Sequence, residues 1–253
     1  MNPFNGGIDF IVVSYYRIDY IKLLIKSIRK FVKHPYLITI VANETPESKE
    51  YLDLFKTYKS AEDVNIIPGT NQVSFEERGG MAGVKWETDK FGNKFGPGSR
   101  NHSRGLTLGM KNTNQKYICF LDNDVVFLNN WVDDILPMTK KYLFITSRFE
   151  KNIARPMFMI FKRGKVPYPD YSYVDSCGNI TKYATDNNLE FKVLKNSLDD
   201  NKLYNEHLIK VPHGEQTYIN DKPFHFHYGR GGSREIEKYK IWVKEVKKFL
   251  NEV

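Results

Sequence analysis

Short apolar runs alternate with amphipathic stretches along the first half of the chain. The runs Ile8–Ser14, Leu37–Ala42 and Val64–Ile67 are short and rich in β-branched residues, a pattern typical of buried strands. Between the first two runs, apolar residues recur at helical spacing, and we expect Asp19 to cap that helix. A second helix is expected at Ser48–Tyr58. The order strand, helix, strand, helix, strand predicts a parallel sheet with right-handed crossovers.

Residues 69–98 interrupt this alternation and contain seven of the 17 glycines. A long glycine-rich connection in a compact domain is usually a functional or mobile loop. Its aromatic residues Trp86, Phe91 and Phe95 could form a lid that excludes water from a site, or the segment could be a surface insertion. A helix is expected next at Ser99–Lys111, followed by a further buried strand.

The second half is less regular, and we expect a substrate-binding half there. Its predicted strands are Leu143–Ser147, Met157–Lys162, Phe191–Leu194 and Leu208–Val211, and its predicted helices are Asn130–Thr139, Ile180–Leu189 and a lysine-rich helix from Ser233. No repeat or low-complexity linker divides the chain, so we expect residues 1–253 to form one domain with halves 1–128 and 129–253.

Composition narrows the class of protein further. The formal net charge is +8, which suits either a polyanionic partner or a lysine-rich solvated surface. No apolar run approaches the roughly 20 residues that span a bilayer, and the first residues lack the basic and apolar segments of a secretory signal. With two unpatterned cysteines, Cys119 and Cys177, we expect a reducing cytoplasmic location.

Two carboxylates interrupt apolar sequence in the middle of the chain. Asp122 and Asp124 follow the apolar run Tyr117–Leu121, and apolar residues resume at once with Val125–Phe127. Ligands bind at the carboxyl ends of strands in open parallel sheets, and side chains at i and i+2 of an extended segment point the same way. Two such carboxylates suit Mg²⁺ or Mn²⁺. The alternative is a loop in which the Asp122 side chain caps a turn and Asp124 faces water.

These residues resemble a known family. Asp122-Asn123-Asp124 is similar to the Asp-x-Asp motif of family 2 glycosyltransferases with the GT-A fold. The resemblance implies a GT-A, Rossmann-related α/β fold with a mostly parallel central sheet, a nucleotide-sugar half at 1–128 and an acceptor half at 129–253. It also implies that Asp124 ligates Mn²⁺ or Mg²⁺, and that Asp122 contacts the metal, a metal-bound water or the ribose. By the same resemblance, Asn123 would contact the nucleotide-sugar donor.

Two further segments resemble the nucleotide-binding turns of that family. Val13–Arg17 is similar to the first strand and the turn that cups the base, which implies contacts from Ser14, Tyr15 and Arg17. The segment from Val41 to Thr45 falls where the family has an acidic turn. Ala42 replaces the first acid here, so Asn43 or Glu44 is expected to contact base or ribose.

The segment Gly98–Leu106 resembles the family's stretch near the diphosphate and sugar. Its cationic residues Arg100, His102 and Arg104 could bind the diphosphate or sugar hydroxyls, or lie exposed at the surface. They precede the strand that carries the two aspartates.

His225 and His227 alternate on a predicted short strand, so both imidazoles lie on one face. Many GT-A enzymes add a late histidine to their metal, and His227 is the better candidate, with His225 second; the alternative is a hydrogen-bonded pair under a loop. In the glycine-rich segment that follows, Arg230 could clamp a diphosphate, or the segment could be a hinge.

Sugar transfer with inversion requires a base that takes the acceptor's proton. Asp175 loosely resembles an acidic residue in some members of the family; the alternative, which the turn-rich sequence favours, is an Asx-turn cap before the helix expected at Ile180–Leu189. Glu215 is the rival candidate.

The sequence therefore predicts a metal-dependent glycosyltransferase, hexosyltransferase-like and inverting by resemblance. Its partners would be a nucleotide-sugar donor and a glycan, lipid-linked or protein acceptor. No nucleic acid is expected as a partner, and the lysine-rich last helix could touch an anionic membrane. One alternative is a nucleotidyltransferase on a related fold, although the turn after the first strand lacks glycine. The other is a basic module that binds nucleic acid or anionic membrane without catalysis.

Overall fold

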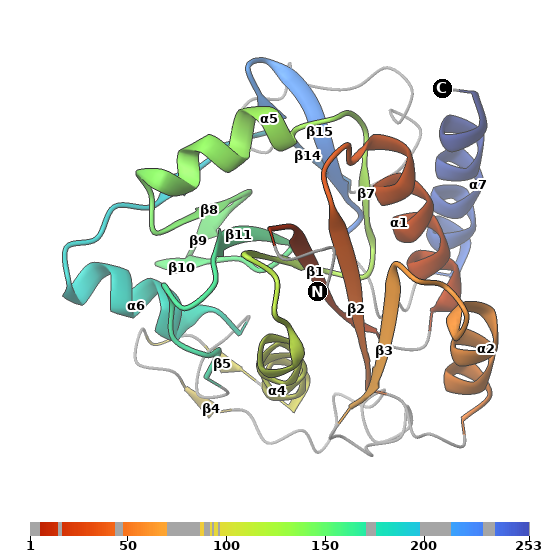
Figure 1. Ribbon diagram of the computed structural model, residues 1–253, viewed down its shortest axis with the longest axis horizontal. Helices are drawn as coiled ribbons and strands as arrows, with labels where there is room; N and C mark the ends of the chain where they lie inside the picture. The colour runs from red at the N-terminus through yellow and green to blue at the C-terminus, as the bar shows by residue number, and fades with distance from the viewer. Residues whose placement is uncertain are drawn as a thin grey trace.

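The computed structural model describes residues 6–14, 17–43, 48–69, 87–88, 92, 94–95, 97–170, 176–197, 214–229 and 236–252. Two main sheets organise these residues, one of seven strands and one of four (Figure 1). Among the described residues, no helix is both long enough and apolar enough to cross a membrane.

The seven-stranded sheet is mainly parallel. Of its strands, only β11 runs antiparallel to its neighbours. In spatial order the strands are β12 (Lys192–Val193), β8 (Phe144–Thr146), β11 (Phe158–Lys162), β6 (Tyr117–Leu121), β1 (Ile8–Ser14), β2 (Tyr36–Ala42) and β3 (Val64–Pro68). The order along the chain reverses at β1, because β2 lies on one side of it and β6 on the other. Such a switch point is where open α/β sheets bind ligands.

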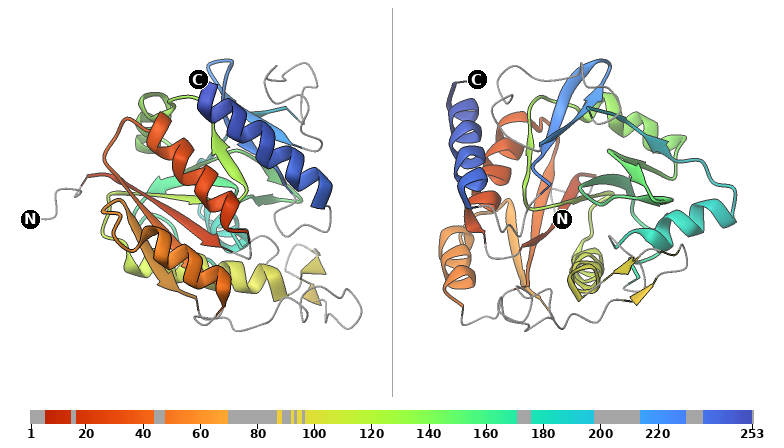
Figure 2. Two further views of the ribbon diagram at one scale, coloured as in Figure 1. Left: turned by 90° about the vertical axis from the view of Figure 1, so that its right-hand side faces the viewer. Right: turned by 180° about the vertical axis from the view of Figure 1, so that it is seen from behind.

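Helices cover both faces of this sheet (Figures 1 and 2). On one face lie α1 (Ile18–Phe31), α2 (Lys49–Tyr58) and α7 (Ile236–Glu252), and on the other lie α4 (Pro97–Asn112) and α6 (Gly178–Asp186). This arrangement explains the uninterrupted apolar sequence of the central strands, since both faces of each strand are buried.

The side chains of β1 show how the two faces are divided. Phe10 and Val12 belong to the apolar cluster beneath α1 and α7, whereas Ile11 and Val13 belong to the cluster beneath α4. Helix α4 lies very close to the strand because Gly105 faces Val13. A Cβ at Gly105 would lie 2.7 Å from Cγ2 of Val13, so any larger residue would push the helix away from the sheet.

The four-stranded sheet is antiparallel and belongs mostly to the second half of the chain. Its strands, in spatial order, are β13 (Lys195–Asn196), β14 (Glu215–Ile219), β15 (Lys222–His227) and β7 (Val125–Phe127). Strand β7 follows β6 after three residues, so the chain passes directly from one sheet into the other. The backbone N–H of Phe127 donates to Oγ of Ser27 (3.0 Å), which ties β7 to α1.

Short elements complete the described part of the chain. They are β4 (Glu87–Thr88) paired with β5 (Lys94–Phe95), β9 (Phe149–Glu150) paired with β10 (Ile153–Ala154), and α5 (Val132–Ile135) continued by the 3₁₀ helix η1 (Leu136–Lys140).

The mixed α/β fold with a mainly parallel sheet is confirmed. The helix expected at Asn130–Thr139 is present as α5 and η1, because Pro137 lacks the N–H that a continuing α-helix requires. Strands β7 and β14 were not predicted. The prediction at Leu208–Val211 lies outside the described residues, as do Trp86 and Phe91 of the glycine-rich segment.

The expected helix cap at Asp19 is wrong. Helix α1 begins at Ile18, its N-cap residue Arg17 makes no side-chain cap hydrogen bond, and Asp19 lies inside the first turn. The carboxylate of Asp19 instead accepts a hydrogen bond from Tyr239 Oη of α7 (2.7 Å). A long-range contact to a helix from the other end of the chain therefore replaces the local one.

A buried carboxylate near the start of β1 makes stability depend on pH. Asp9 is fully buried, Thr39 Oγ1 donates to its Oδ2 (3.0 Å), and burial raises its pKa from 3.8 to about 6. Because the folded pKa exceeds the unfolded one, the stability that Asp9 contributes is complete below pH 3.8 and is lost as the pH rises through 6.

We therefore expect Asp9→Asn to be more stable than the native protein at pH 7 by up to about 3 kcal/mol, and by much less at pH 4. Urea unfolding of both proteins across this pH range measures the difference. Asp53→Asn, a change at an exposed residue of α2, should leave the pH profile unchanged. Parallel profiles for Asp9→Asn and the native protein would contradict the prediction.

Candidate functional site

The segment Asp122-Asn123-Asp124 forms the turn between the two sheets. Strand β6 ends at Leu121, which is in register with Val12 of β1, so Asp122 emerges at the carboxyl edge of the large sheet beside the switch point. Asp124 is 2% exposed and directly precedes β7. The two carboxylates therefore lie on a turn, not on the extended segment that the sequence suggested.

Pairing of β15 with β7 brings a histidine to this turn. His227 is in register with Val125, and the next backbone N–H, that of Tyr228, donates to the carbonyl oxygen of Asp124 (3.0 Å). Sheet hydrogen bonds thus fix the position of His227 relative to Asp124, although the two residues are far apart in the sequence.

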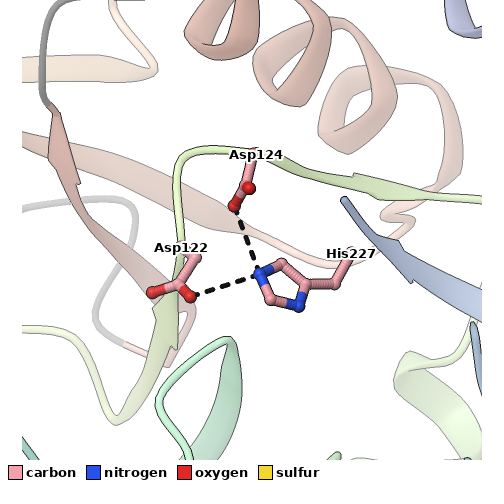
Figure 3. Close-up of side chains that lie close together, drawn as sticks. All are labelled: Asp122, Asp124 and His227. Carbon is pink, nitrogen blue, oxygen red and sulfur yellow. Dashed lines mark ion pairs between the residues drawn. The ribbon is translucent and has the colours of Figure 1, made fainter. Parts of the chain in front are cut away.

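The three side chains converge on one point (Figure 3). Nε2 of His227 lies 3.4 Å from Oδ2 of Asp122 and 3.3 Å from Oδ1 of Asp124. One ligand atom from each residue lies within 4.8 Å of the others, so the group can hold a metal ion. Two carboxylate oxygens and one imidazole nitrogen suit Mn²⁺ well, and oxygen-rich sites suit Mg²⁺. The Asp122 side chain is 27% exposed, which leaves one side of the cluster open to a ligand.

The cluster concentrates negative charge around one imidazole. Burial acts to lower the pKa of His227, but Asp124, Asp122 and Glu215 outweigh it and raise the pKa well above its usual value. Burial acts to raise the pKa of Asp122, yet the hydrogen bond from His227 holds it below its usual value. The carboxylates therefore stabilise positive charge at this position, and a divalent cation would have to compete with a proton for Nε2.

His102 approaches the cluster from α4. Its Nε2 lies 3.6 Å from Oδ1 of Asp122, and its Nδ1 lies 3.0 Å from Oγ of Ser176. Ser176 in turn donates to the carbonyl oxygen of Ser99 (3.2 Å). Because burial lowers the pKa of His102, the neutral imidazole is favoured there. His102 thus links Asp122 to the segment after residue 175.

His225 is not part of the metal-binding group. Its Nδ1 lies 3.1 Å from Thr217 Oγ1, and its Nε2 lies 3.2 Å from the carbonyl oxygen of Met157. Burial lowers its pKa to about 3, so it is a neutral, internally hydrogen-bonded residue. Of the two candidates, the geometry favours His227, which was the preferred one.

Two of the predicted nucleotide contacts, Ser14 and Asn43, lie along the same edge of the sheet. Ser14 is the last residue of β1, and Asn43 follows β2. The Asn43 N–H donates to the Ser14 carbonyl oxygen (3.2 Å). Nδ2 of Asn43 also donates to the carbonyl oxygen of Asn101 in α4 (3.3 Å). The guanidinium of Arg17 lies 4.5 Å from the ring centroid of Tyr239. The two Asn43 hydrogen bonds join the ends of β1 and β2 to α4, and the Arg17 contact joins the start of α1 to α7.

Three of the remaining predicted site residues are among the described residues, and four are not. Asn123 is buried in the turn, Arg100 is half-buried on α4, and Arg104 is exposed on the same helix. The candidates Tyr15, Glu44, Asp175 and Arg230 lie outside the described residues. Their roles, and the choice of general base, stay predictions.

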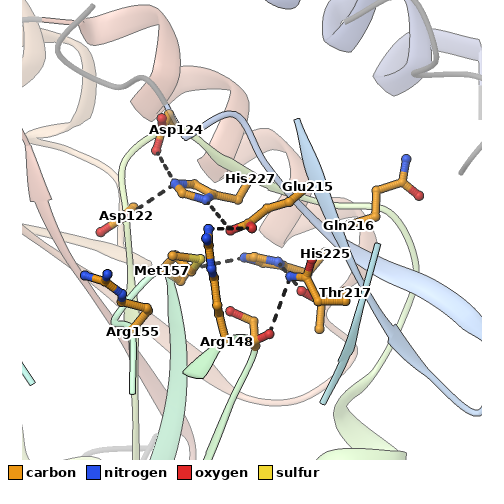
Figure 4. A network of polar contacts seen from close by, with 12 residues as sticks. Asp122, Asp124, Arg148, Arg155, Met157, Glu215, Gln216, Thr217, His225 and His227 are labelled. Atoms are coloured by element: carbon orange, nitrogen blue, oxygen red, sulfur yellow. Dashed lines mark hydrogen bonds and ion pairs between the residues drawn. The ribbon is translucent and has the colours of Figure 1, made fainter. Parts of the chain in front are cut away.

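Glu215 lies directly behind His227 (Figure 4). Its Oε1 is 2.8 Å from Nδ1 of His227, and its Oε2 accepts from Nη1 of Arg148 (2.9 Å). Burial acts to raise the pKa of Glu215, but the contacts with His227 and Arg148 hold it below its usual value. Arg148 was not predicted as a site residue, because nothing in its local sequence distinguishes it from the other arginines of the chain; in the structure it is half-buried.

No known protein family and no curated protein matches the sequence. Among solved structures, S. aureus TarS 1–349 in complex with UDP is similar over 98% of this chain and 66% of its own, with a TM-score of 0.52 and 9% identity. A mannosyltransferase, PcManGT from Pyrobaculum calidifontis in complex with GDP-Man and Mn²⁺, is similar over 76% of this chain and 55% of its own, with a TM-score of 0.47 and 10% identity.

The likeness to TarS 1–349 concerns the fold, since the identity is low. The chain has the GT-A fold of glycosyltransferases, as the resemblance of its Asp-x-Asp segment indicated. It spans between half and two thirds of the lengths of these two solved structures.

The geometry predicts which changes weaken metal binding. We expect the native protein to bind one Mn²⁺ and Asp124→Asn to bind it at least about tenfold more weakly, because a ligand oxygen loses its charge. Isothermal titration with MnCl₂ measures both affinities. Asp53→Asn provides a matched loss of one carboxylate at an exposed position of α2 that is not part of the group, and equal weakening in this control would contradict the assignment.

Proposed function

We propose that this protein is a metal-dependent glycosyltransferase that moves a sugar from a nucleoside-diphosphate sugar to an acceptor hydroxyl. The observation that carries the proposal is the convergence of Asp122, Asp124 and His227 at the switch point of the large sheet. Carboxylates at this place in a GT-A fold suit a cation that binds a diphosphate.

Within this proposal, Asp122, Asp124 and His227 hold Mn²⁺ or Mg²⁺. When bound, the cation supplies positive charge that stabilises the departing nucleoside diphosphate. The open side of Asp122 leaves room for phosphate oxygens. A diphosphate ligand is also supported by TarS 1–349, whose structure contains UDP and shares this fold.

The nucleoside would lie along the ends of β1 and β2. Ser14 and Asn43 are joined there by a backbone hydrogen bond, and Asn43 also reaches α4, so their positions are fixed before a ligand arrives. Preorganisation of this kind reduces the entropy lost on binding. Tyr15 and Glu44 border the same strand ends in the sequence.

We propose inversion at the anomeric carbon, with Asp175 as the base that takes the acceptor's proton. The neighbouring Ser176 contacts His102, and His102 approaches Asp122, so the chain next to Asp175 is anchored beside the metal cluster. The sugar, the base and the acceptor stay open, and the acceptor can be a glycan, a lipid-linked saccharide or a protein.

A nucleotide screen tests the donor class. The melting temperature is measured with UDP, GDP, dTDP and CMP, each with and without Mn²⁺. We expect one of the four to raise it by several degrees, and only when Mn²⁺ is present, because ligands that bind only the folded state stabilise it by mass action. Asp124→Asn should abolish the metal-dependent part of the rise. Asp53→Asn should retain it.

Extending the screen to nucleoside triphosphates, sugar phosphates and polyanions separates the alternatives. A nucleotidyltransferase would be stabilised by a nucleoside triphosphate and a sugar phosphate and would release pyrophosphate. A basic binding module would keep its affinity for polyanions in Asp124→Asn and would lose it steeply with salt. Release of free sugar and nucleoside diphosphate from a nucleotide sugar, dependent on Mn²⁺, would support the transferase.

A further inference from the structure

Glu215 and His227 face each other across adjacent strands. They form a directly opposed pair in the antiparallel ladder of β14 and β15, with Oε1 of Glu215 2.8 Å from Nδ1 of His227. Both side chains are nearly inaccessible, at 4% and 8% exposed. The contact is therefore set by strand register and is protected from water.

The second oxygen of Glu215 is also engaged. Nη1 of Arg148 donates to Oε2 (2.9 Å), while Nη2 of Arg148 lies 2.8 Å from Oε2 of Glu150. Arg155 contacts the same Glu150 oxygen (3.1 Å). A network of ion pairs thus begins at Glu150 and Arg148. It continues from Arg148 through Glu215 to His227, and it ends at Asp122 and Asp124 (Figure 4).

These ion pairs determine which ring nitrogen of His227 can bind a cation. Glu215 occupies Nδ1, so Nε2 is the nitrogen directed at the two aspartates. An imidazole that ligates a metal through Nε2 must carry its remaining proton on Nδ1, where a carboxylate is the strongest acceptor available. The negative charge of that carboxylate also makes Nε2 a better electron donor.

His225 shows that strand position alone does not produce this arrangement. It lies two residues earlier on β15, but its partners are the Thr217 hydroxyl and the Met157 carbonyl oxygen. No carboxylate of the described residues is hydrogen bonded to it. The difference between the two histidines is therefore the residue opposite each one on β14, Glu215 or Thr217.

We propose that Glu215, anchored by Arg148, is a positioning residue that holds His227 with its proton on Nδ1 and so presents Nε2 to the divalent cation of the Asp122–Asp124–His227 group. This inference rests on the metal site of the proposed function and not on sugar transfer itself. It gives Glu215 a role other than the general base, because both of its oxygens are already engaged inside the protein.

Mn²⁺ titration measures the effect on affinity. We expect Glu215→Gln to bind Mn²⁺ about 10- to 100-fold more weakly than the native protein, the range typical for loss of a carboxylate behind a metal-binding histidine. Arg148→Gln, which leaves Glu215 in place but removes its anchor, should weaken binding by a smaller factor. Arg148→Lys should restore part of the loss.

Thr217→Val is the matched control. It changes the residue two positions along β14 and removes the hydroxyl contact of His225 without touching His227. We expect its Mn²⁺ affinity to remain within about twofold of the native value, even if its melting temperature falls, since the ligand atoms are unaffected. Circular dichroism and melting of each metal-free variant establish that it is folded. If Glu215→Gln does not fold, Arg148→Gln carries the test.

Nuclear magnetic resonance of protein labelled with ¹⁵N-histidine and loaded with Mg²⁺ gives a second measurement, independent of activity. The native protein should show a downfield ring proton on an Nδ1 nitrogen that is absent in His227→Gln and shifted upfield in Glu215→Gln. A native protein that binds no Mn²⁺ would refute the metal site and with it the metal-dependent part of the proposed function. Native binding with unchanged affinity and ring-proton shift in Glu215→Gln would refute only the role of Glu215.

Discussion

The concentration of negative charge around one imidazole is the constraint on which this structure depends. Asp122, Asp124 and Glu215 all approach His227, and none of the three is fully solvated. Carboxylates buried so close together are costly unless positive charge lies among them. The fold meets this requirement by bringing strand β15 to the turn after β6, and by placing Arg148 behind Glu215.

The turn at residues 122–124 also has a structural role, because it connects two sheets of different character. Before it, β6 belongs to a mainly parallel sheet buried on both faces, and after it, β7 belongs to an antiparallel one. Ser27 of α1 accepts the Phe127 N–H, so the first helix also supports β7. The polar cluster lies at the turn between the last paired residue of β6 and the first paired residue of β7.

Much of the first half could be predicted from sequence. Apolar runs of strand length alternate with helical periodicity from Ile8 to Pro68, and the strands and helices lie within a residue or two of the expected positions. Asp122 and Asp124 were identifiable because two charges interrupt a buried run. The cap at Asp19 failed because a partner from α7, invisible to local sequence, provides its hydrogen bond.

The second half was predicted less well for a related reason. Strand β14 begins with Glu215 and carries Gln216 and Thr217, so it lacks the apolar alternation that marks a strand, and its stability comes from pairing on both sides. The roles of Glu215 and Arg148 depend on contacts between residues 67 positions apart. Spacing along the chain carries no information about such pairs.

The order in which the residues occur has a consequence for biosynthesis. The last strand of the large sheet, β12, ends at Val193, whereas the four-stranded sheet is completed only when β15 reaches His227. A nascent chain can therefore assemble the large sheet while Asp122 and Asp124 still lack their histidine. Assembly of the Asp122–Asp124–His227 group can thus follow that of the sheet that carries its two carboxylates.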